Sequence, residues 1–360
     1  MTRSRGFPQA SAPTKHHAKP EIALILNPES GSNDEEFVQK VRTSLDKSGR
    51  AFICLETDPD KGAVPAVEQA IERGVQTLLV CGGDGTVMSA VNALGKADAD
   101  LKLAIVPGGT ANLLAHALEV PLDVEGAVVA ALDGDERRID LGACGDTLFA
   151  LGMGLGLTEK LVSGASAQEK ERLGRWAYVK ALLQEVGAAP STFSYTLDDG
   201  PEQTARGVAV VVANAGTISG KVEFAPDAKM DDGLLNLVIL HRLNALDLVR
   251  LGWKALFGGM KHDRGLTCVA GKTIGIKSNP PLDLQIDGEE VELRPPLRVE
   301  TRPGALRVAV PSEEQKTSFA QAVAQEIAEP VAKSGLPRWW VWLTVGGLIG
   351  ALVWKICKRK

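Results

Sequence analysis

Two glycine-rich segments carry the residue types that bind phosphate groups. The first, Gly82-Gly83-Asp84-Gly85-Thr86, follows an apolar run at 77–81 and precedes a helical pattern over residues 87–94. Glycine lets backbone N–H groups approach phosphate oxygens without a Cβ in the way, and the following helix adds the positive end of its dipole. Asp84 would hold Mg²⁺ or a nucleotide hydroxyl, and Thr86 would donate to a phosphate. The alternative interpretation of the glycines alone is a tight turn.

The second segment, Pro107-Gly108-Gly109-Thr110-Ala111-Asn112, repeats this arrangement after the apolar run 103–106, before a helix expected to begin near Leu113. Two such loops at neighbouring strand ends face one crevice, which favours a nucleotide site over structural turns. Neither loop has the G-x-x-x-x-G-K-[ST] or the G-x-G-x-x-G spacing. The sequence therefore disfavours a P-loop and standard nicotinamide binding.

The elements that must position these loops alternate between strand and helix. Strands are expected at 21–26 and 51–56, and helices at 34–48 and 64–73. Such alternation predicts a parallel α/β sheet, in which ligands lie beyond the carboxyl ends of the strands.

After about residue 140 the pattern changes to strand-like runs, many of them separated by Asp-Gly turns. The runs are 147–151, 193–197, 206–213, 234–241, 272–277, 282–286, 297–301 and 306–310. This pattern predicts a second, antiparallel β domain, which we expect to be a sandwich.

The composition indicates a globular chain of two domains. It has 360 residues, 44% of them hydrophobic and 24% charged, and a net charge of -5 that argues against a nucleic-acid partner. Five scattered cysteines favour reduced thiols in the cytoplasm over a disulfide framework, and the histidines form no zinc motif.

The two ends of the chain are expected to lie outside the domains. Residues 1–20 are a polar tail without the apolar stretch of a secretory signal, and residues 312–338 have helical spacing typical of a spacer. Residues 339–357 predict a hydrophobic membrane-anchor helix with tryptophans at both ends. Whether that helix spans the bilayer or lies in its interface stays open. Its glycines would allow close pairing of two helices in a homodimer.

The order of motifs resembles the diacylglycerol kinase catalytic-domain superfamily, and most closely its soluble bacterial lipid-kinase branch. The motifs span about residues 21–311. Besides the two glycine-rich segments, they are Asn27-Pro28 with Ser30-Gly31, Thr57, Asp140-Leu141-Gly142, Phe224-Ala225-Pro226-Asp227-Ala228, Asp231-Asp232-Gly233-Leu234-Leu235 and Asp287-Gly288-Glu289.

The resemblance implies an α/β ATP-binding domain at 21–140, related in fold to NAD kinase, and a β-sandwich domain at 141–311, with ATP between them. It implies that ATP contacts Thr57, the segment Gly82–Met88 with Val87, and the residues Gly109, Thr110 and Asn112. It also implies that Glu289 is the base that activates the lipid hydroxyl, with Asp287 a competitor for that role and Asp84 a further catalytic residue. A Mg²⁺ ion is implied at Asp232 and the carbonyls of Lys229 and Leu234.

These expectations describe a lipid kinase that transfers the γ-phosphate of ATP to a lipid hydroxyl at a membrane, with diacylglycerol the default acceptor. Two alternatives remain. A soluble NAD kinase shares the first loop but explains neither the second loop nor the apolar tail. A non-catalytic, membrane-associated lipid-binding protein would retain the fold without the reaction.

Overall fold

The computed structural model describes residues 19–28, 35–156, 190–218, 222, 223, 225, 227–241, 254, 265–319 and 321. The expected tail up to residue 18, the spacer after 321 and the hydrophobic helix at 339–357 lie outside these residues, as do motif residues Ser30, Gly31, Phe224 and Pro226. Among the helices that the structure does describe, none is long and apolar enough to cross a membrane. Residues 313–319, at the start of the predicted spacer, are helical.

The first half of the chain forms the predicted parallel α/β layer. Four neighbouring strands run parallel in the order β2 (Phe52–Glu56), β1 (Ile22–Leu26), β3 (Thr77–Gly82) and β4 (Lys102–Pro107). Nearly every residue of β1, β3 and β4 is buried, which explains their continuous apolar runs. The helices α1 (Glu35–Ser48), α2 (Val64–Glu72), α3 (Asp84–Ala97) and α5 (Val124–Asp133) bury their apolar faces in the same core.

The second half forms a β-sandwich, as predicted. One sheet has the strand order β14 (Leu266–Gly271), β13 (Leu235–Leu240), β10 (Ala209–Ala213), β7 (Gly152–Leu155), β16 (Leu284–Ile286) and β17 (Glu289–Val291). The facing layer contains β15 (Thr273–Asn279), β8 (Ser191–Leu197) and β9 (Gln203–Gly207). The described strand pairs of both layers are antiparallel, and both layers contribute to one core that contains Phe193, Leu235 and Ile274. The predicted single strand at 206–213 is wrong, because β9 and β10 belong to different sheets.

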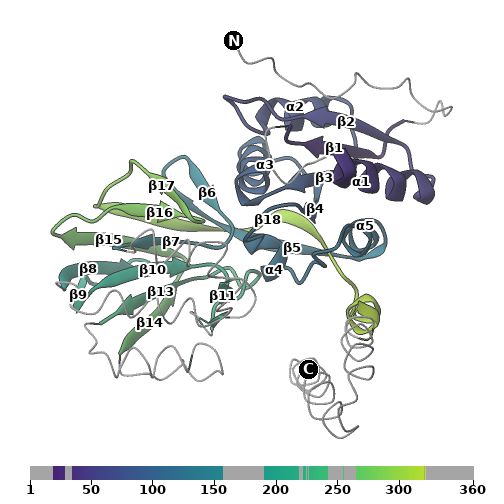
Figure 1. Ribbon diagram of the computed structural model, residues 1–360. Coiled ribbons are helices and arrows are strands. Elements are labelled where there is room, and N and C mark those ends of the chain that lie inside the picture. The colour runs from purple at the N-terminus through teal and green to yellow at the C-terminus, as the bar shows by residue number, and fades with distance from the viewer. Residues whose placement is uncertain are drawn as a thin grey trace, which may run out of the picture.

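One long strand joins the two halves. The two strands predicted at 297–301 and 306–310 are a single strand, β18 (Leu297–Val310), with a register shift between Arg302 and Leu306. Its first part pairs with β15 of the sandwich, and its last part pairs in parallel with β4. Strand β5 (Asp135–Cys144) runs antiparallel along both parts. Figure 1 shows β5 and β18 crossing from the α/β layer to the sandwich.

A buried carboxylate holds β18 where its register shifts. Asp140 of β5 is 2% exposed. Its Oδ1 accepts a hydrogen bond from the N–H of Gly304 at 2.7 Å, and its Oδ2 accepts one from the N–H of Gly233 at 2.6 Å. Hydrogen bonds from backbone N–H groups to an ionised carboxylate are stronger than those to a neutral acceptor. Asp140 therefore ties the bend of β18 to the turn that follows Asp232.

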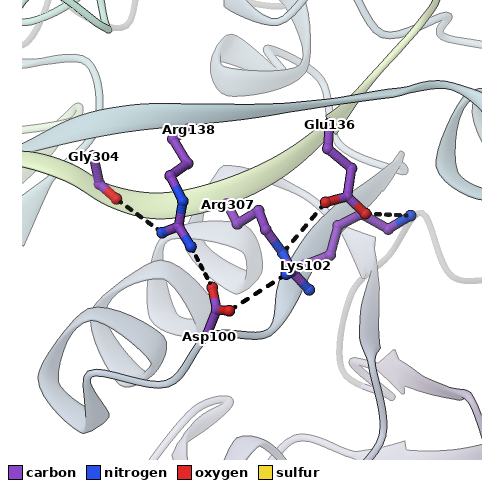
Figure 2. A network of polar contacts seen from close by, with 6 residues as sticks. All are labelled: Asp100, Lys102, Glu136, Arg138, Gly304 and Arg307. Atoms are coloured by element: carbon purple, nitrogen blue, oxygen red, sulfur yellow. Dashed lines mark hydrogen bonds and ion pairs between the residues drawn. The ribbon is translucent and has the colours of Figure 1, made fainter.

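Ion pairs on the surface connect the same strands to the loop after α3. Arg138 of β5 donates to Asp100 Oδ1 at 2.8 Å and to the carbonyl of Gly304 at 3.3 Å. Arg307 of β18 lies 3.4 Å from Asp100 and 3.6 Å from Glu136, and Figure 2 shows how these side chains converge. Exposed pairs of this type stabilise a fold only weakly, so the buried Asp140 carries more of the constraint.

Replacing Asp140 tests this constraint. Asp140→Asn is expected to lower the free energy of unfolding by about 2–3 kcal/mol, because at least one buried backbone N–H then loses its acceptor. Asp231→Asn is the matched control, since it removes only the exposed ion pair with Arg137. Its expected cost is below about 1 kcal/mol. Urea-induced unfolding measures both, and equal losses would contradict the role given to Asp140.

Candidate active site

Helix α3 begins inside the first glycine-rich segment. It starts at Asp84, three residues before the predicted start at Val87, and its N-cap is Gly83 in an extended conformation (φ −84°, ψ −175°). The N–H groups of Asp84, Gly85 and Thr86 therefore belong to the first helical turn, where they have no acceptor within the helix. With the helix dipole behind them, these donors form an anion-binding end directly after β3.

The two glycine-rich segments lie in direct backbone contact. A Cβ added to Gly109 would lie 2.5 Å from the Cα of Gly83, and a Cβ added to Gly83 would lie 3.3 Å from the Cα of Gly109. The N–H of Gly108 donates to the carbonyl of Gly82 at 2.9 Å, which extends the pairing of β3 with β4. Gly83 and Gly109 are thus required for this close approach of the two backbones.

Asp84 ties the second segment to α3. Its Oδ2 accepts from the N–H of Asn112 at 2.9 Å, and its Oδ1 accepts from the N–H of Leu113 at 2.5 Å, at the start of α4 (Leu113–Ala117). Asn112 has a φ of 47°, and its side chain accepts from the N–H of Gly109 and donates to the carbonyl of the same residue. Both carboxylate oxygens of Asp84 are therefore engaged in ordering the two loops.

A cavity of about 140 Å³, which we call the Thr57 cavity, lies beside the first turn of α3. The Nδ2 of Asn27 donates to the Oγ1 of Thr86 at 3.1 Å at its edge. Its lining consists of Asn27, Pro28, Thr57, Asp58, Pro59, Gly62, Ala63, Gly85, Thr86 and Ser89. Thr57 and Thr86, two of the expected nucleotide contacts, therefore face one space.

A second cavity, of about 310 Å³, borders the adjacent face of the same helical turn, and we call it the Glu289 cavity. Asp84 and Met88, four residues apart on α3, line it, whereas Gly85 and Ser89 line the Thr57 cavity. The remaining lining residues are Asn92, Ala111, Leu113, Thr147, Leu148, Ile286, Asp287, Gly288, Glu289 and Val291.

The β16–β17 hairpin brings Glu289 to the N-terminus of α3. Its Oε1 lies 3.1 Å from the position of a Cβ added to Gly85. Gly85 lines the Thr57 cavity and Glu289 lines the second cavity, so this carboxylate stands at the boundary between the two. The sequence could not predict this contact, because Gly85 and Glu289 lie far apart along the chain.

Asp287 has a different environment. It and Gly288 form the two-residue hairpin turn with φ of 48° and 94°, the positive values that this turn requires. Its carboxylate accepts three backbone hydrogen bonds of 2.8–2.9 Å, from Ala150, Leu151 and Gly152. The pKa of Asp287 is raised to about 6, chiefly because the carboxyl is buried. The charge of Asp84 also raises this pKa, and the hydrogen bonds from the three N–H groups offset part of the rise.

The sequence left Glu289 and Asp287 as competitors for the role of base, and their partners distinguish them. The oxygens of Asp287 are engaged by three backbone donors that fix the hairpin turn. Glu289 is exposed, and its carboxylate faces the N-terminal end of α3. The geometry thus favours Glu289 as the group that meets a substrate. It favours Asp287 as the group that fixes the hairpin turn and so positions Glu289.

The residues expected to hold Mg²⁺ lie on the turn that Asp140 anchors. The Oδ1 of Asp232 accepts from the N–H of Leu234 at 3.0 Å, and the residue is exposed. Neighbouring Asp231 is neutralised by Arg137 at 3.0 Å. Within the described residues, no three His, Cys, Asp or Glu side chains cluster as metal ligands. One carboxylate with backbone carbonyls, such as those of Lys229 and Leu234, and with water is still an oxygen set that suits Mg²⁺.

Three other residues that were expected to contact ATP do not line the Thr57 cavity. Val87 is 4% exposed and packs in the α/β core. Met88 lines the Glu289 cavity, and Thr110 is exposed on the second segment.

The sequence did not indicate a role in the site for one buried residue, Asn214. Asn214 is fully buried, and its Nδ2 donates to the carbonyls of Asp140 and Ala150 at 2.8 and 2.7 Å. It thereby links the anchor of β18 to the segment that binds Asp287. Its only signal in the sequence is a polar residue directly after the apolar run of β10.

Comparison with known families gives two matches that together cover both halves. Residues 21–144 match the diacylglycerol kinase catalytic domain, and residues 158–310 match the YegS C-terminal NAD kinase beta sandwich-like domain.

Individual proteins that are similar to this chain have names from the same families. The chain is 33% identical over 299 residues to a Pseudomonas aeruginosa protein named "Probable lipid kinase YegS-like", covering 82% of this chain and 95% of that protein. It is 29% identical to a Staphylococcus epidermidis diacylglycerol kinase, covering 74% and 84%. A crystal structure of a diacylglycerol kinase from Bacillus anthracis superimposes with a TM-score of 0.69 at 26% identity, covering 82% of this chain and 98% of that one.

The contact between the two loops can be tested with one methyl group. Gly109→Ala is expected to weaken ATP binding about tenfold or more, because its Cβ would force the backbone of Gly83 away. Gly271→Ala is the control, since Gly271, like Gly109, has no positive φ, and a Cβ added there would meet other atoms only at ordinary contact distances of 3.4 Å or more. Calorimetric titration with ATP compares the two, and similar affinities would contradict the close contact.

The pKa of Asp287 predicts a pH dependence of stability. Because it is raised from 3.8 to about 6, the folded state binds more protons than the unfolded state between these values. Asp287 therefore stabilises the folded state by about 3 kcal/mol below about pH 4, and this contribution is lost as the pH rises through 6. Unfolding of the wild type and of Asp287→Asn between pH 4 and 7 should give curves of different slope, whereas parallel curves would refute the assignment.

Proposed function

Because the chain belongs to the diacylglycerol kinase catalytic domain family, we propose that it is a lipid kinase that transfers the γ-phosphate of ATP to the hydroxyl of diacylglycerol, giving phosphatidic acid. One observation carries the proposal. Glu289, from the sandwich, faces Gly85 at the N-terminus of α3, from the α/β layer. A carboxylate base and a set of phosphate-binding N–H groups therefore share one boundary.

The α/β layer would bind the nucleotide. The Thr57 cavity would hold one part of the ATP molecule. The N–H groups of Asp84, Gly85 and Thr86 would donate hydrogen bonds to its phosphate oxygens. Mg²⁺ bound with ATP supplies charge neutralisation, on which phosphoryl transfer mainly depends. A second Mg²⁺ would be held by Asp232 with the carbonyls of Lys229 and Leu234.

Glu289 would act as the base. Its carboxylate takes the proton of the lipid hydroxyl while that oxygen forms a bond to the γ-phosphorus, and the bond to the bridging oxygen breaks as ADP leaves. Asp287 holds the hairpin turn so that Glu289 reaches Gly85. Asp84 keeps the two loops together so that the donors point at one place.

The choice of diacylglycerol rests on the names of the relatives and on the apolar tail of the sequence. Residues 339–357, if inserted in a membrane as predicted, would keep the enzyme near its lipid substrate. Binding of lipid vesicles by a folded protein without transfer would instead favour the non-catalytic lipid-binding protein.

Two neighbouring glutamates provide the test. Glu289→Gln is expected to lower kcat about 10²- to 10⁴-fold, the range for loss of a general base, with the affinity for ATP unchanged. Glu290→Gln is the control, because successive strand residues point to opposite faces and Glu290 does not line the cavity. It should retain kcat within about twofold. Equal activity of the two variants with diacylglycerol would exclude Glu289 as the base.

A further inference from the structure

A cavity of about 420 Å³ lies at the edge of the α/β layer where the parallel strands begin, and we call it the Lys102 cavity. Its lining includes the first residues of β1, β3 and β4, which are Ile22, Thr77 and Lys102. The two glycine-rich segments follow the opposite ends of β3 and β4. The length of β4, about 16 Å at ~3.3 Å per residue, therefore separates this cavity from the candidate active site.

Three cations stand side by side on the strands next to this cavity. Arg307 of β18 is the register partner of Lys102 on β4 and of Arg138 on β5. Figure 2 shows the three side chains with the two carboxylates that they contact. Register partners project from the same face of a sheet, where like charges repel each other. The row of cations therefore needs negative charge beside it.

The carboxylates of the chain supply this charge unevenly. Arg138, which is exposed, lies 2.8 Å from Asp100, an ordinary distance for an ion pair with a hydrogen bond. The side chains of Lys102 and Arg307 are only 12% and 25% exposed, yet they lie 3.5 and 3.6 Å from oxygens of Glu136. Arg307 is also 3.4 Å from Asp100. The more buried cations thus have the longer contacts, although desolvated charges require the closer ones.

Arg307 shows the same deficit at a single atom. Its Nε is buried and has no hydrogen-bond acceptor among the described residues. A buried donor without an acceptor lowers the stability of a fold, so an oxygen atom brought to it by a ligand would be favourable.

The carboxylate that stands between the two buried cations can give way to a ligand. Glu136 offers one oxygen to Lys102 and the other to Arg307, and its side chain is 50% exposed. It can turn toward solvent without losing a short hydrogen bond, which leaves both cations facing the cavity. The charged residues of the lining are Glu21, Arg50, Lys102, Glu136 and Arg307. Of these, Arg50 already has a partner in Asp133 at 2.9 Å.

We propose that the Lys102 cavity binds a phosphate-type anion, either inorganic phosphate or a phosphomonoester, at a site separate from the glycine-rich loops. Its oxygens would accept hydrogen bonds from Lys102 Nζ and from the guanidinium of Arg307, whose planar set of donors matches phosphate. The cavity volume lies within the ~300–1,000 Å³ found for small-molecule sites.

The bound anion would stabilise the junction of the two halves of the chain. Strand β18 pairs with β4 through Arg307 and Lys102 and through the next residues, Val308 and Leu103. An anion between the first two side chains turns a repulsive register pair into a bridged one. Binding is therefore expected to stabilise the folded state.

Thermal unfolding tests the site without any turnover. The Tm of the wild type is expected to rise saturably with sodium phosphate, relative to sodium chloride of the same ionic strength, because a ligand that binds only the folded state stabilises it. Lys102→Gln should raise the phosphate concentration at half-saturation about tenfold or more, and Arg307→Gln should act in the same direction. Lys277→Gln is the matched control, since it removes the same charge from an exposed ion pair on the sandwich and should keep the wild-type response.

Two outcomes would overturn the inference. Equal Tm values of the wild type in phosphate and chloride would show that no phosphate binds. An equal phosphate-dependent rise in the wild type and in Lys102→Gln would show that Lys102 serves only its ion pair with Glu136.

Calorimetric titration with ATP distinguishes this site from the glycine-rich loops. Lys102→Gln should bind ATP with an affinity within about twofold of the wild type. Asp84→Ala should lose affinity for ATP and keep the phosphate-dependent rise in Tm. The opposite pattern, in which the rise is lost in Asp84→Ala and kept in Lys102→Gln, would place phosphate at the loops and contradict the inference.

The source of the anion is identified by displacement of radiolabelled phosphate from the wild type in equilibrium dialysis. Displacement by glycerol 3-phosphate would assign the site to a soluble phosphomonoester. Displacement by phosphatidylcholine vesicles that contain phosphatidic acid, and not by phosphatidylcholine alone, would assign it to a lipid headgroup. Displacement by unlabelled phosphate only would assign it to inorganic phosphate. Each of these results supports the site, provided that Lys102→Gln binds the label about tenfold more weakly.

Discussion

The site depends on one strand that belongs to two cores. The proposed phosphoryl transfer needs a base and phosphate-binding N–H groups that are held in a fixed geometry. The N–H groups at the start of α3 lie in the α/β layer, whereas Glu289 lies in the sandwich. Strand β18 pairs with β4 in one layer and with β15 in the other, while β5 follows it throughout. Asp140 anchors the bend between the two parts and leaves neither of its oxygens free. The sheet is therefore continuous across the candidate active site.

The carboxylates of both layers serve different purposes according to their hydrogen-bond partners. Asp84, Asp140 and Asp287 each accept at least two backbone N–H hydrogen bonds, and each thereby joins segments distant in sequence. Glu289 is exposed and directed at the first turn of α3. Asp84 and Asp287, which organise the backbone, line the same cavity as Glu289, the proposed base. Chemical type alone would not separate these roles.

The sequence predicted what local patterns can encode. Glycines after buried apolar runs gave the two loops, alternation gave the parallel sheet, and short runs with Asp-Gly turns gave the sandwich. It did not predict that 297–301 and 306–310 are one strand, because the Arg-Pro-Gly segment between them is typical of a turn and becomes a bend only when paired with β5. Nor could it predict the partners of Asp140, Asp287 and Asn214, since tertiary packing supplies them. Met88, expected with the nucleotide, lines the cavity of Glu289 because residues 84 and 88 share a helix face.

The most direct test of the central claim is transfer of radiolabel from [γ-³²P]ATP to diacylglycerol in vesicles, with and without Mg²⁺, by the wild type and by Asp84→Ala. If the protein is this kinase, a labelled lipid will appear only with Mg²⁺ and will be absent with the variant, because the two loops lose the carboxylate that joins them. A folded wild-type protein that binds the vesicles but labels no lipid would contradict it, and the two glycine-rich loops would then serve binding alone.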